Sequence, residues 1–395
     1  MKKKKLLLLN GSHSEIGLIK EAQKLGYYVI TSGNLRTGIG HSYADENIFE
    51  DYSDYEAIYK IAEKNKISSI VSCCNDFGII TASYVAEKMN LRGHDSFETT
   101  CRLHHKDTFR RLCLELNIHA PIARDFKSRE EAYSSVANWE YPVIVKPIDL
   151  TGGKGVSKVT SEKDFYAAVN KAFEKTRAGK IVIEPFIEGT AHSFSTFIVD
   201  KKVVAYFSDN EYTYKNPFLI SSSAGPATDI ERIKNILIVD IEKLATHLNL
   251  VDGIFHSQYI LKNGTPYILE MTRRCSGDLY STPVEHATGI AWTEWIVRAE
   301  CGMDCSEFPR NKKQKIFGGR HCIMGDRNGI VQDVKIADEL KGNIYGEITW
   351  WKPHFLIEDY LSDKLGILFL EYANEKEMID KINRITELVK VIYED

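Results

Sequence analysis

Two lysines and three glycines lie close together at the end of a short apolar run. Residues 143–156 read VIVKPIDLTGGKGV, so the run ends at Lys146 and a glycine-rich segment begins at Thr151. Glycine lets the backbone approach a ligand closely, so such a loop can wrap phosphates with its N–H groups. The spacing is not that of a Walker A loop. The segment indicates an anion site that Lys146 reaches as a point charge, and the alternative is a hairpin turn with solvated lysines.

A second polar segment follows Lys146 by about 38 residues, where IVIEPFIEG occupies residues 181–189. A strand ends at Glu184, and Glu188 lies on the connection that follows it. A strand that passes into a linker leaves backbone donors and acceptors unpaired, and these suit the edge of an adenine ring. A carboxylate such as Glu188 suits a ribose, because it can accept hydrogen bonds from the ribose hydroxyls. The alternative is a surface loop with two solvated glutamates.

The segment 254–274 predicts a β-hairpin, because two apolar strands flank an Asn-Gly pair. A two-residue loop would place Gln258 opposite Leu269, with Glu270 on the other face. A three-residue loop, 263–265, would place Gln258 opposite Glu270. Only the longer loop leaves one face of the hairpin continuously apolar, so we predict that register. In it, one face carries His256, Gln258, Ile260, Ile268, Glu270 and Thr272, and the other carries Phe255, Tyr259, Leu261, Tyr267, Leu269 and Met271.

Polar groups gather at the end of this hairpin away from the turn. The amide oxygen of Gln258 and the carboxylate of Glu270 would lie side by side, with Arg274 just beyond. Mg²⁺ takes few protein oxygens and lets phosphates and water complete its octahedron. The hairpin therefore favours a magnesium site beside the phosphate site, and the alternative is a half-exposed sheet face with ordinary polar residues.

The first hundred residues alternate between short apolar strands and amphipathic helices. This alternation predicts a parallel sheet with both faces covered. The expected strands are 5–11, 27–33 and 67–74, and the expected helices are 14–26, 55–66 and 77–90. Ligands often bind at the carboxyl ends of such strands.

The rest of the chain changes in pattern several times. A helix over 104–118 precedes a small α+β unit, in which helices 128–139 and 164–176 accompany strands 142–147 and 180–186. Strands dominate from 191 to 272, with 208–225 expected as a loop that could close the site. A strand-rich segment from 316 ends in a helix over 375–392.

Length and composition bound the class of protein. A chain of 395 residues predicts two or three domains. Its net charge of −4 is not the basic surplus of a nucleic-acid binder. The N-terminal MKKKKLLLLN has too short an apolar run for a signal peptide, and no stretch approaches the length of a membrane span. Eight scattered cysteines favour reduced thiols, so we expect a cytoplasmic protein without nucleic-acid or membrane partners.

Five segments together resemble the ATP-grasp superfamily. They are HHKDTFRRL, VIVKP with TGGKGV, IEPFIEG, HSQYI and ILEMTRRCSGD, and they occur in the family's order from 104 to about 290. The resemblance implies a mixed α/β and α+β fold. It comprises an N-terminal Rossmann-like parallel-sheet domain (1–103), a two-lobed ATP-grasp domain (104–315, small lobe 120–188) and a strand-rich α+β C-terminal domain (316–395), similar to biotin carboxylase.

The resemblance also implies roles for individual residues. ATP would be held by Lys106, Lys146, Thr151, Gly152, Gly153, Gly155, Val156, Ser157, Glu184, Phe186, Ile187 and Glu188. Magnesium would be held by Gln258, Glu270 and Thr272, although Thr272 stands where the family often has the better ligand Asn. Arg274 and Lys146 would act on the transferring phosphoryl group. Candidate substrate contacts are His192, Tyr212, Lys215, His256, Gly277 and Asp278, the last two in a segment similar to that of amino-acid and peptide ligases.

The implied reaction is that of a carbon–nitrogen ligase. ATP would phosphorylate a carboxylate to an acyl phosphate, and an amine would then displace phosphate to leave an amide, ADP and phosphate. The partners would be a small acid and a small amine, and a homodimer is compatible with the family. Two alternatives stay open: an enzyme of the carboxylase or carbamoyl-phosphate type that activates bicarbonate, and a nucleotide-binding protein without turnover.

Overall fold

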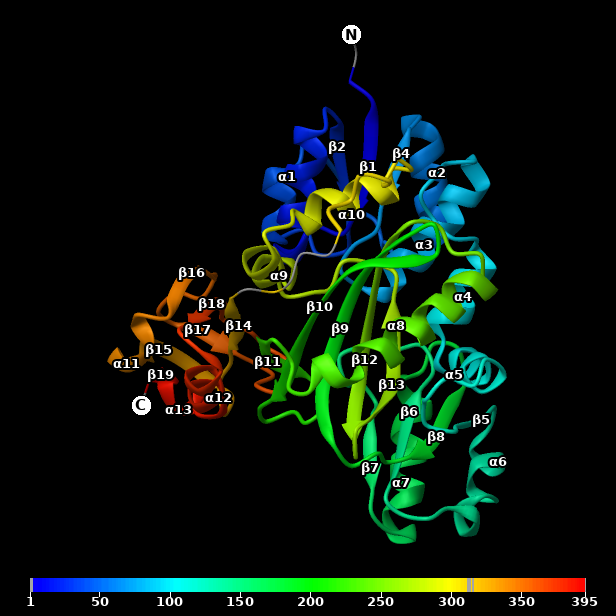
Figure 1. Cartoon of the computed structure of the whole chain (residues 1–395), viewed down its shortest axis with the longest axis vertical. Coiled ribbons are helices and arrows are strands. Elements are labelled where there is room, and N and C mark those ends of the chain that lie inside the picture. The colour runs from blue at the N-terminus through cyan, green and yellow to red at the C-terminus, as the bar shows by residue number, and fades with distance from the viewer. Residues whose placement is uncertain (1–2, 311–313, 315, 395) are drawn as a thin grey trace.

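The computed structural model describes residues 3–310, 314 and 316–394 of the chain. Its strands form a four-stranded parallel sheet, an eight-stranded antiparallel sheet, and two further antiparallel sheets of three and four strands. In Figure 1 the parallel sheet lies at the top, the small four-stranded sheet at the bottom, and the C-terminal lobe projects to the left. This mixed α/β and α+β architecture is the predicted fold class.

The N-terminal parallel sheet has the strand order β3-β2-β1-β4. Its strands are β1 (Lys5–Leu9), β2 (Tyr28–Ser32), β3 (Glu46–Ile48) and β4 (Ser69–Val71), and the helices on it are α1 (Ile16–Lys24), α2 (Tyr55–Asn65), α3 (Asp76–Met89) and α10 (Trp292–Glu300). Alternate leucines of β1 face opposite sides: Leu6 and Leu8 pack with α1 and α10, and Leu7 and Leu9 pack with α2 and α3. The predicted parallel sheet with covered faces is confirmed.

Helix α10 comes from far along the chain, yet it lies beside β1 and β4 (Figure 1). The N-terminal sheet is thus completed by residues beyond the boundary that the sequence predicts at 103. The boundaries of the three domains stay predictions, and residue 315, at one of them, lies outside the described residues.

The predicted helix over 104–118 is wrong in its extent. Two helices meet there, α4 (Phe97–His104) and α5 (Lys106–Glu115), because His105 has extended backbone angles of φ −86° and ψ 125°. The break places Lys106 at the first turn of α5. Its side chain can therefore reach the glycine-rich segment, where its Nζ donates to the Leu150 carbonyl at 2.8 Å.

The small lobe is a four-stranded sheet with the order β5-β8-β6-β7. Its elements are β5 (Arg124–Phe126), β6 (Val143–Pro147), β7 (Ser157–Val159), β8 (Ile181–Pro185), α6 (Arg129–Tyr133), the short 3-10 helix η3 (Val136–Asn138) and α7 (Glu162–Lys175). The helix predicted over 128–139 ends at Tyr133. The chain turns after α6, and Val136 in η3 and Trp139 beyond it pack against the lobe's own core.

The eight-stranded sheet carries the rest of the site and has the order β13-β12-β9-β10-β11-β14-β18-β16. Its strands are β9 (Thr190–Val199), β10 (Lys202–Thr213), β11 (Ile220–Gly225), β12 (Gly253–Lys262), β13 (Thr265–Thr272), β14 (Phe317–Ile323), β16 (Ile344–Thr349) and β18 (Gly366–Tyr372). Helix α9 (Ser281–Thr288) follows the hairpin β12–β13.

One helix in this region was missed. Helix α8 (Ile230–His247) interrupts the segment predicted to be strands, and its apolar residues recur at helical spacing. Together with α5, four of its residues pack against one face of the large sheet: Ile233, Leu237, Ile241 and Leu244. The opposite face is therefore left for the site and for α9.

The C-terminal residues complete two sheets. β14, β16 and β18 extend the large sheet, while β15 (Gly329–Ile336), β17 (Phe355–Ile357) and β19 (Val389–Tyr393) form the three-stranded one. The helices are α11 (Asp338–Lys341), α12 (Glu375–Asn383) and α13 (Ile385–Leu388). The helix predicted over 375–392 is too long, because Val389–Tyr393 pairs with β15 as a strand.

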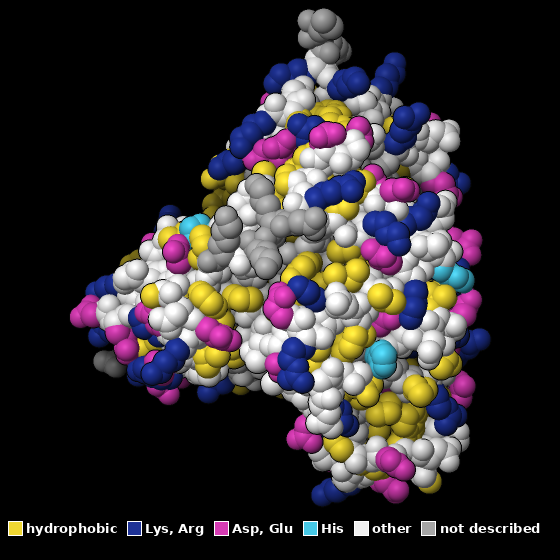
Figure 2. Space-filling model, in the orientation of Figure 1, with side chains coloured by type: hydrophobic (Ala, Val, Ile, Leu, Met, Phe, Trp, Pro, Cys, Tyr) yellow, Lys and Arg dark blue, Asp and Glu magenta, His cyan; other side chains and the backbone are white. Residues whose placement is uncertain are grey.

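The surface carries charges of both signs. On the face shown in Figure 2, basic and acidic side chains alternate over all three lobes. The mixture agrees with the small net charge of the sequence.

Candidate active site

A cavity of about 590 Å³ lies between the small lobe and the large sheet. Most of the predicted site residues line it: Lys106, Lys146, Thr151, Gly152, Gly153, Val156, Glu184, Phe186, Ile187, His256, Gln258, Glu270, Thr272, Arg274, Gly277 and Asp278. Segments from 106 to 278 thus converge on one space, large enough for a small-molecule ligand.

Among the predicted residues that do not line the cavity are Gly155, Ser157, Glu188 and His192. His192 is 1% exposed, and its ring stacks on Tyr259 with centroids 5.1 Å apart. Burial lowers the pKa of His192 to about 4, so the ring is neutral at ordinary pH. Its surroundings are those of a core histidine. Tyr212 and Lys215, also candidate substrate contacts, lie outside the lining as well.

The hairpin β12–β13 has the predicted pairing at its functional end but not the predicted loop. Lys262 pairs with Thr265, so the loop has two residues. A bulge between Gln258 and Tyr259 then shifts the register by one, and Gln258 pairs with Glu270 and His256 with Thr272.

The bulge also changes which side chains share a face. Ile268 was predicted on the polar face but is fully buried in the core with Tyr259. Leu269, predicted on the apolar face, lines the cavity instead. A bulge satisfies the Asn-Gly turn and the pairing of Gln258 with Glu270 together, which an unbroken ladder cannot do.

Gln258 and Glu270 form a donor set that fits magnesium. The Nε2 of Gln258 donates to both carboxylate oxygens of Glu211, each at 2.9 Å, so its amide oxygen is not the atom engaged there. Glu270 Oε2 lies 3.5 Å from Lys106 Nζ. One amide and one carboxylate oxygen on paired strands match an ion that completes its shell with phosphates and water. The Thr272 hydroxyl instead donates to Asp76 at 3.2 Å.

Lys146 is held by a buried carboxylate. Its Nζ forms an ion pair with Glu184, whose other contacts are Arg110 Nε at 2.9 Å and Arg110 Nη2 at 3.3 Å. Burial lowers the pKa of Lys146 to about 8, against the raising effect of Glu184. Burial alone would raise the pKa of Glu184, but the two cations lower it to about 2. The Glu184 carboxylate therefore positions Lys146 toward the cavity.

Arg274 is positioned from the N-terminal part of the chain. Its Nε donates to Asp76 at 2.8 Å, and its Nη1 donates to the Cys275 carbonyl at 2.9 Å. Burial would raise the pKa of Asp76, but Arg274 and His104 hold it well below its usual range. Asp76 begins α3, so the sheet that precedes the ATP-grasp segments supplies the anchor for this arginine.

The glycine-rich segment contacts a hairpin rather than a loop. Residues 208–225 were predicted as a loop, but β10 runs to Thr213 and β11 starts at Ile220, leaving a short tip. A Cβ on Gly153 would lie 2.6 Å from Phe218 Cβ, so the two segments touch through the glycine backbone. Gly153 also has φ +73°, which favours glycine.

Sequence reasoning missed several charged residues that line the same cavity. They are Asp76, Glu211, Arg320 and Lys364. Burial, then Asp209, raises the pKa of Glu211 to about 8. Lys364 Nζ lies 2.6 Å from Asp278 Oδ2, and Arg320 Nη1 lies 3.3 Å from the same oxygen. Packing between segments far apart in the chain brings these positions together, and no local motif marks them.

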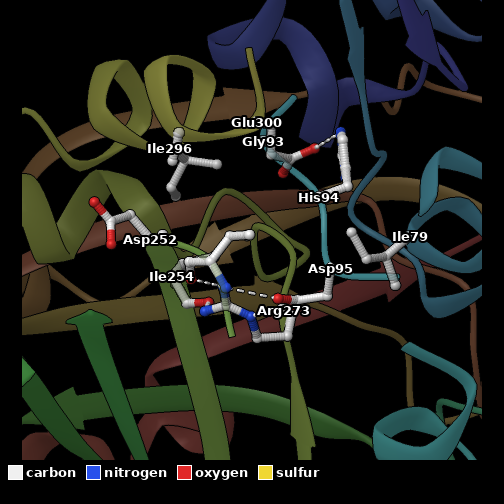
Figure 3. Close-up of a pocket in the computed structure, with 12 residues that line it drawn as sticks. Ile79, Gly93, His94, Asp95, Asp252, Ile254, Arg273, Ile296 and Glu300 are labelled. Carbon is white, nitrogen blue, oxygen red and sulfur yellow. Dashed lines mark hydrogen bonds and ion pairs between the residues drawn. The ribbon is translucent and has the colours of Figure 1, made fainter. Parts of the chain in front are cut away.

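A second pocket, of about 10 Å³, lies between α3, residues 93–95, the start of β12, Arg273 and α10. Figure 3 shows Arg273 directed at Asp95 and Glu300 facing His94. Arg273 Nε lies 2.9 Å from Asp95 Oδ2, and Glu300 Oε2 lies 4.0 Å from His94 Nε2. This space is about the size of one water molecule. The ion pairs around this space hold distant segments of the chain together, and the space is not a ligand site.

Some further features concern the described residues only. None of the helices over 3–310 and 316–394 is long and apolar enough to cross a membrane. All eight cysteines are free. In the described part of the chain, no group of three or more His, Cys, Asp or Glu side chains is arranged to hold a metal ion.

The chain was compared with known proteins. Residues 104–216 match the family model for the ATP-grasp (A) domain of phosphoribosylglycinamide synthetase. The chain is 25% identical over 274 residues to the C-terminal section of the carbamoyl phosphate synthase large chain from Methanocaldococcus jannaschii, covering 67% of this chain and 44% of the relative. It spans less than half the length of the curated relatives it matches.

Solved structures share the whole fold. An L-amino acid ligase from Bacillus licheniformis matches with a TM-score of 0.81 and 19% identity over 100% of both chains. The biotin carboxylase domain of the 2-oxoglutarate carboxylase from Hydrogenobacter thermophilus, solved with MgADP and bicarbonate, matches with a TM-score of 0.76 and 16% identity over 99% of this chain and 91% of that one. Residues 104–216 thus match an ATP-grasp domain in sequence, and the whole chain has the fold of the ligase and of the carboxylase domain.

Proposed function

We propose that the chain is an ATP-dependent carboxylate–amine ligase that forms an amide bond and releases ADP and phosphate. One observation carries the proposal: Lys106, Lys146 and Arg274 line the same cavity as the paired side chains of Gln258 and Glu270. Three cations beside an amide–carboxylate pair suit the charge of a triphosphate that transfers its terminal phosphoryl group.

The first step would activate the acid. A carboxylate oxygen of the substrate attacks the γ-phosphorus of ATP, the bond to the β–γ bridging oxygen breaks, and ADP leaves. Lys146, held by Glu184, and Lys106 neutralise the phosphates, and Arg274, held by Asp76, faces the transferring group. Mg²⁺, when bound by Gln258 and Glu270, would neutralise phosphate charge.

The second step would form the amide. The acyl phosphate is a better electrophile than the carboxylate, because phosphate is a good leaving group. An amine attacks the acyl carbon, the carbon–nitrogen bond forms, and the acyl carbon–oxygen bond breaks. A substrate ammonium loses two protons in all, one carried away on the phosphate and one released to water. No side-chain nucleophile is required, so the residues contribute position and charge.

A bicarbonate-activating enzyme is the second candidate. The sequence matches to carbamoyl phosphate synthase large chains favour it, and so does the fold shared with a biotin carboxylase domain solved with bicarbonate. A nucleotide-binding protein without turnover is less well supported, because Lys146, Glu270 and Arg274 are all present and all line the cavity.

A release assay for ADP separates these candidates. The protein, ATP and Mg²⁺ would be incubated with pools of carboxylic acids, pools of amines, both together, or bicarbonate with an amine. The ligase proposal predicts that ADP release rises most when acid and amine are both present. Release that needs bicarbonate and no organic acid would support the second candidate, and no release above background in any pool would support binding without turnover.

A further inference from the structure

An acidic and a basic side chain stand in one row of the large sheet. Glu211 on β10 pairs with Ser223 on β11, and Ser223 pairs with Arg320 on β14. Directly paired residues point to the same face of a sheet, and two strand spacings separate the ends of the row by about 10 Å. Glu211 and Arg320 both line the cavity.

The Arg320 end of the row has spare positive charge. Arg320 is only 6% exposed, and its Nε has no hydrogen-bond partner within the described residues. Its neighbour Asp278 is already engaged by Lys364 at 2.6 Å. Two cations therefore share one carboxylate, and a buried donor is left without an acceptor, which is a costly arrangement unless a ligand supplies one. A carboxylate suits the planar fork of arginine.

The Glu211 end lacks a cation, because no basic side chain of the described residues donates to its carboxyl group. The hydrogen bonds to the Glu211 carboxylate come from the single Nε2 of Gln258, a neutral donor. The nearby Asp209 is buried and accepts from hydroxyls, among them Tyr280 at 3.3 Å, so it brings no cation to Glu211. The row thus ends in a carboxyl group without a cation at β10 and in an arginine at β14, and an ammonium bound at β10 would favour the ionised form of Glu211.

We propose that Glu211 and Arg320 form a subsite for the zwitterion of an α-amino acid, with its ammonium on Glu211 and its carboxylate on Arg320. This inference rests on the proposed ligase function and names the class of one substrate. Because Glu211 contacts Gln258, the ammonium end lies next to the Gln258–Glu270 pair, and the carboxylate end lies farther along the sheet. The amino acid is therefore the substrate that supplies the amine.

Binding measurements test the subsite without any turnover. The protein with Mg²⁺ and a non-hydrolysable ATP analogue would be titrated by calorimetry with each of the twenty common amino acids. The tightest would then be compared with its carboxamide, which lacks the carboxylate, and with its 2-hydroxy acid, which lacks the ammonium. We expect each analogue to bind at least about tenfold more weakly, since each loses one charge-assisted contact.

Two variants assign the contacts. With Glu211→Gln, the Kd values of the amino acid and the hydroxy acid should differ by less than about threefold. With Arg320→Met, the Kd values of the amino acid and the carboxamide should differ by less than about threefold. A general loss of structure would weaken the binding of all three ligands alike. It would not remove only the preference for the amino acid over one of its two analogues. Asp338→Asn is the control, because that side chain is 94% exposed in α11, and it should keep both preferences.

Three outcomes would overturn the subsite: no amino acid binds, the native protein does not distinguish the amino acid from its analogues, or Glu211→Gln weakens Mg²⁺ binding and leaves amino-acid binding unchanged. The last would make Glu211 a metal ligand. Failure of the ligase proposal is seen separately, as absence of ADP release with acid and amine while binding and its preferences persist.

Discussion

Gln258 and Glu270 face each other across β12 and β13 because a bulge one residue away corrects the register that the two-residue turn would impose. The pair lies on the cavity wall, with Lys106 3.5 Å from Glu270. An amide oxygen and a carboxylate fixed on paired strands need little reorganisation to hold an ion between phosphates. The relationship makes Glu270 the residue whose charge matters most for the proposed reaction.

Replacing Glu270 by Gln should therefore lower kcat by at least about a hundredfold, the usual effect of removing one electrostatic contact from a reacting centre. The change keeps the shape of the side chain, so the melting temperature should change little. Steady-state ADP release at saturating Mg²⁺ measures the effect. Lys262→Gln, at the exposed end of the same hairpin, is the matched control and should keep native turnover. A Glu270→Gln protein with near-native kcat would exclude the metal role.

ATP binding should depend on the charge of Lys146. Because its pKa is lowered to about 8 in the free protein, the side chain is protonated below pH 8 and loses its charge above it. A bound triphosphate favours the charged form, so the Kd of ATP should rise as pH increases through 8. Calorimetry from pH 6.5 to 9.5 tests this.

Lys146→Ala should weaken ATP binding at pH 7 by about tenfold or more, because it removes a charge-assisted contact to phosphate. The substitution should also flatten the rise of the Kd of ATP above pH 8. If the Kd of ATP for this variant rises with pH as steeply as for the native protein, another group titrates.

The contact between the glycine-rich segment and the β10–β11 tip can be tested with neighbouring glycines. Gly152 and Gly153 have φ of +65° and +73°, so alanine is strained at either. Only at Gly153 would the added Cβ meet Phe218, at 2.6 Å, since the nearest atom to Gly152 is Leu219 Cδ1 at 3.9 Å. Gly153→Ala should therefore weaken ATP binding several-fold more than Gly152→Ala.

Hydrogen exchange gives an independent measurement of the same contact. Residues 151–157 should become protected when an ATP analogue binds to the native protein and to Gly152→Ala, but much less in Gly153→Ala, because the clash holds the segment away from the tip. Equal affinity and equal protection in the two variants would contradict the contact.

Glu300 should make the fold sensitive to pH. Its carboxylate accepts from the Ser72 backbone N–H at 2.6 Å and from Ser72 Oγ at 2.9 Å, beside His94 (Figure 3). Burial raises the pKa of Glu300 to about 7 from an ordinary value of 4.5, so the folded protein holds a proton that the unfolded chain releases. Stability should fall as pH rises from 4.5 to 7 and this contribution should then level off.

Glu300→Gln removes the titrating group and can keep both contacts, because the Ser72 hydroxyl can turn to accept. At pH 8 the variant should be more stable than the native protein by on the order of 2 kcal/mol, and the difference should shrink toward pH 5. Denaturant unfolding at pH 5, 6.5 and 8 measures it. A difference that does not change with pH would show that Glu300 does not titrate in this range.

The sequence allowed much of the site to be predicted, because local patterns carry it. Lys146, Gly153 and Gln258 were identified from short segments in which glycine, charge and alternation have a direct physical meaning. The pairing of Gln258 with Glu270 was also predicted correctly, but from a loop length that the structure contradicts. A bulge leaves no signal that distinguishes it from a longer loop when both keep polar residues together.

Residues brought in by pairing over long distances could not be predicted. Glu211 lies 47 residues from Gln258, within a segment that its Gly, Ser and Asn content made look like a loop. Asp76 reaches Arg274 across 198 residues of chain. Such contacts depend on how distant strands and helices pack together, and that packing has no local signature. Helix α8 was missed because the neighbouring strand patterns dominated the interpretation of that region.

The fate of the carboxylate oxygen tests the central claim most directly. The acid that supports ADP release would be labelled with ¹⁸O in its carboxylate and converted together with its amine, and the inorganic phosphate would be analysed by mass. Phosphorylation of the carboxylate followed by attack at the acyl carbon predicts one ¹⁸O atom in each phosphate and ADP as the nucleotide product. Unlabelled phosphate, or AMP and pyrophosphate as products, would contradict an acyl phosphate formed at the Gln258–Glu270 centre.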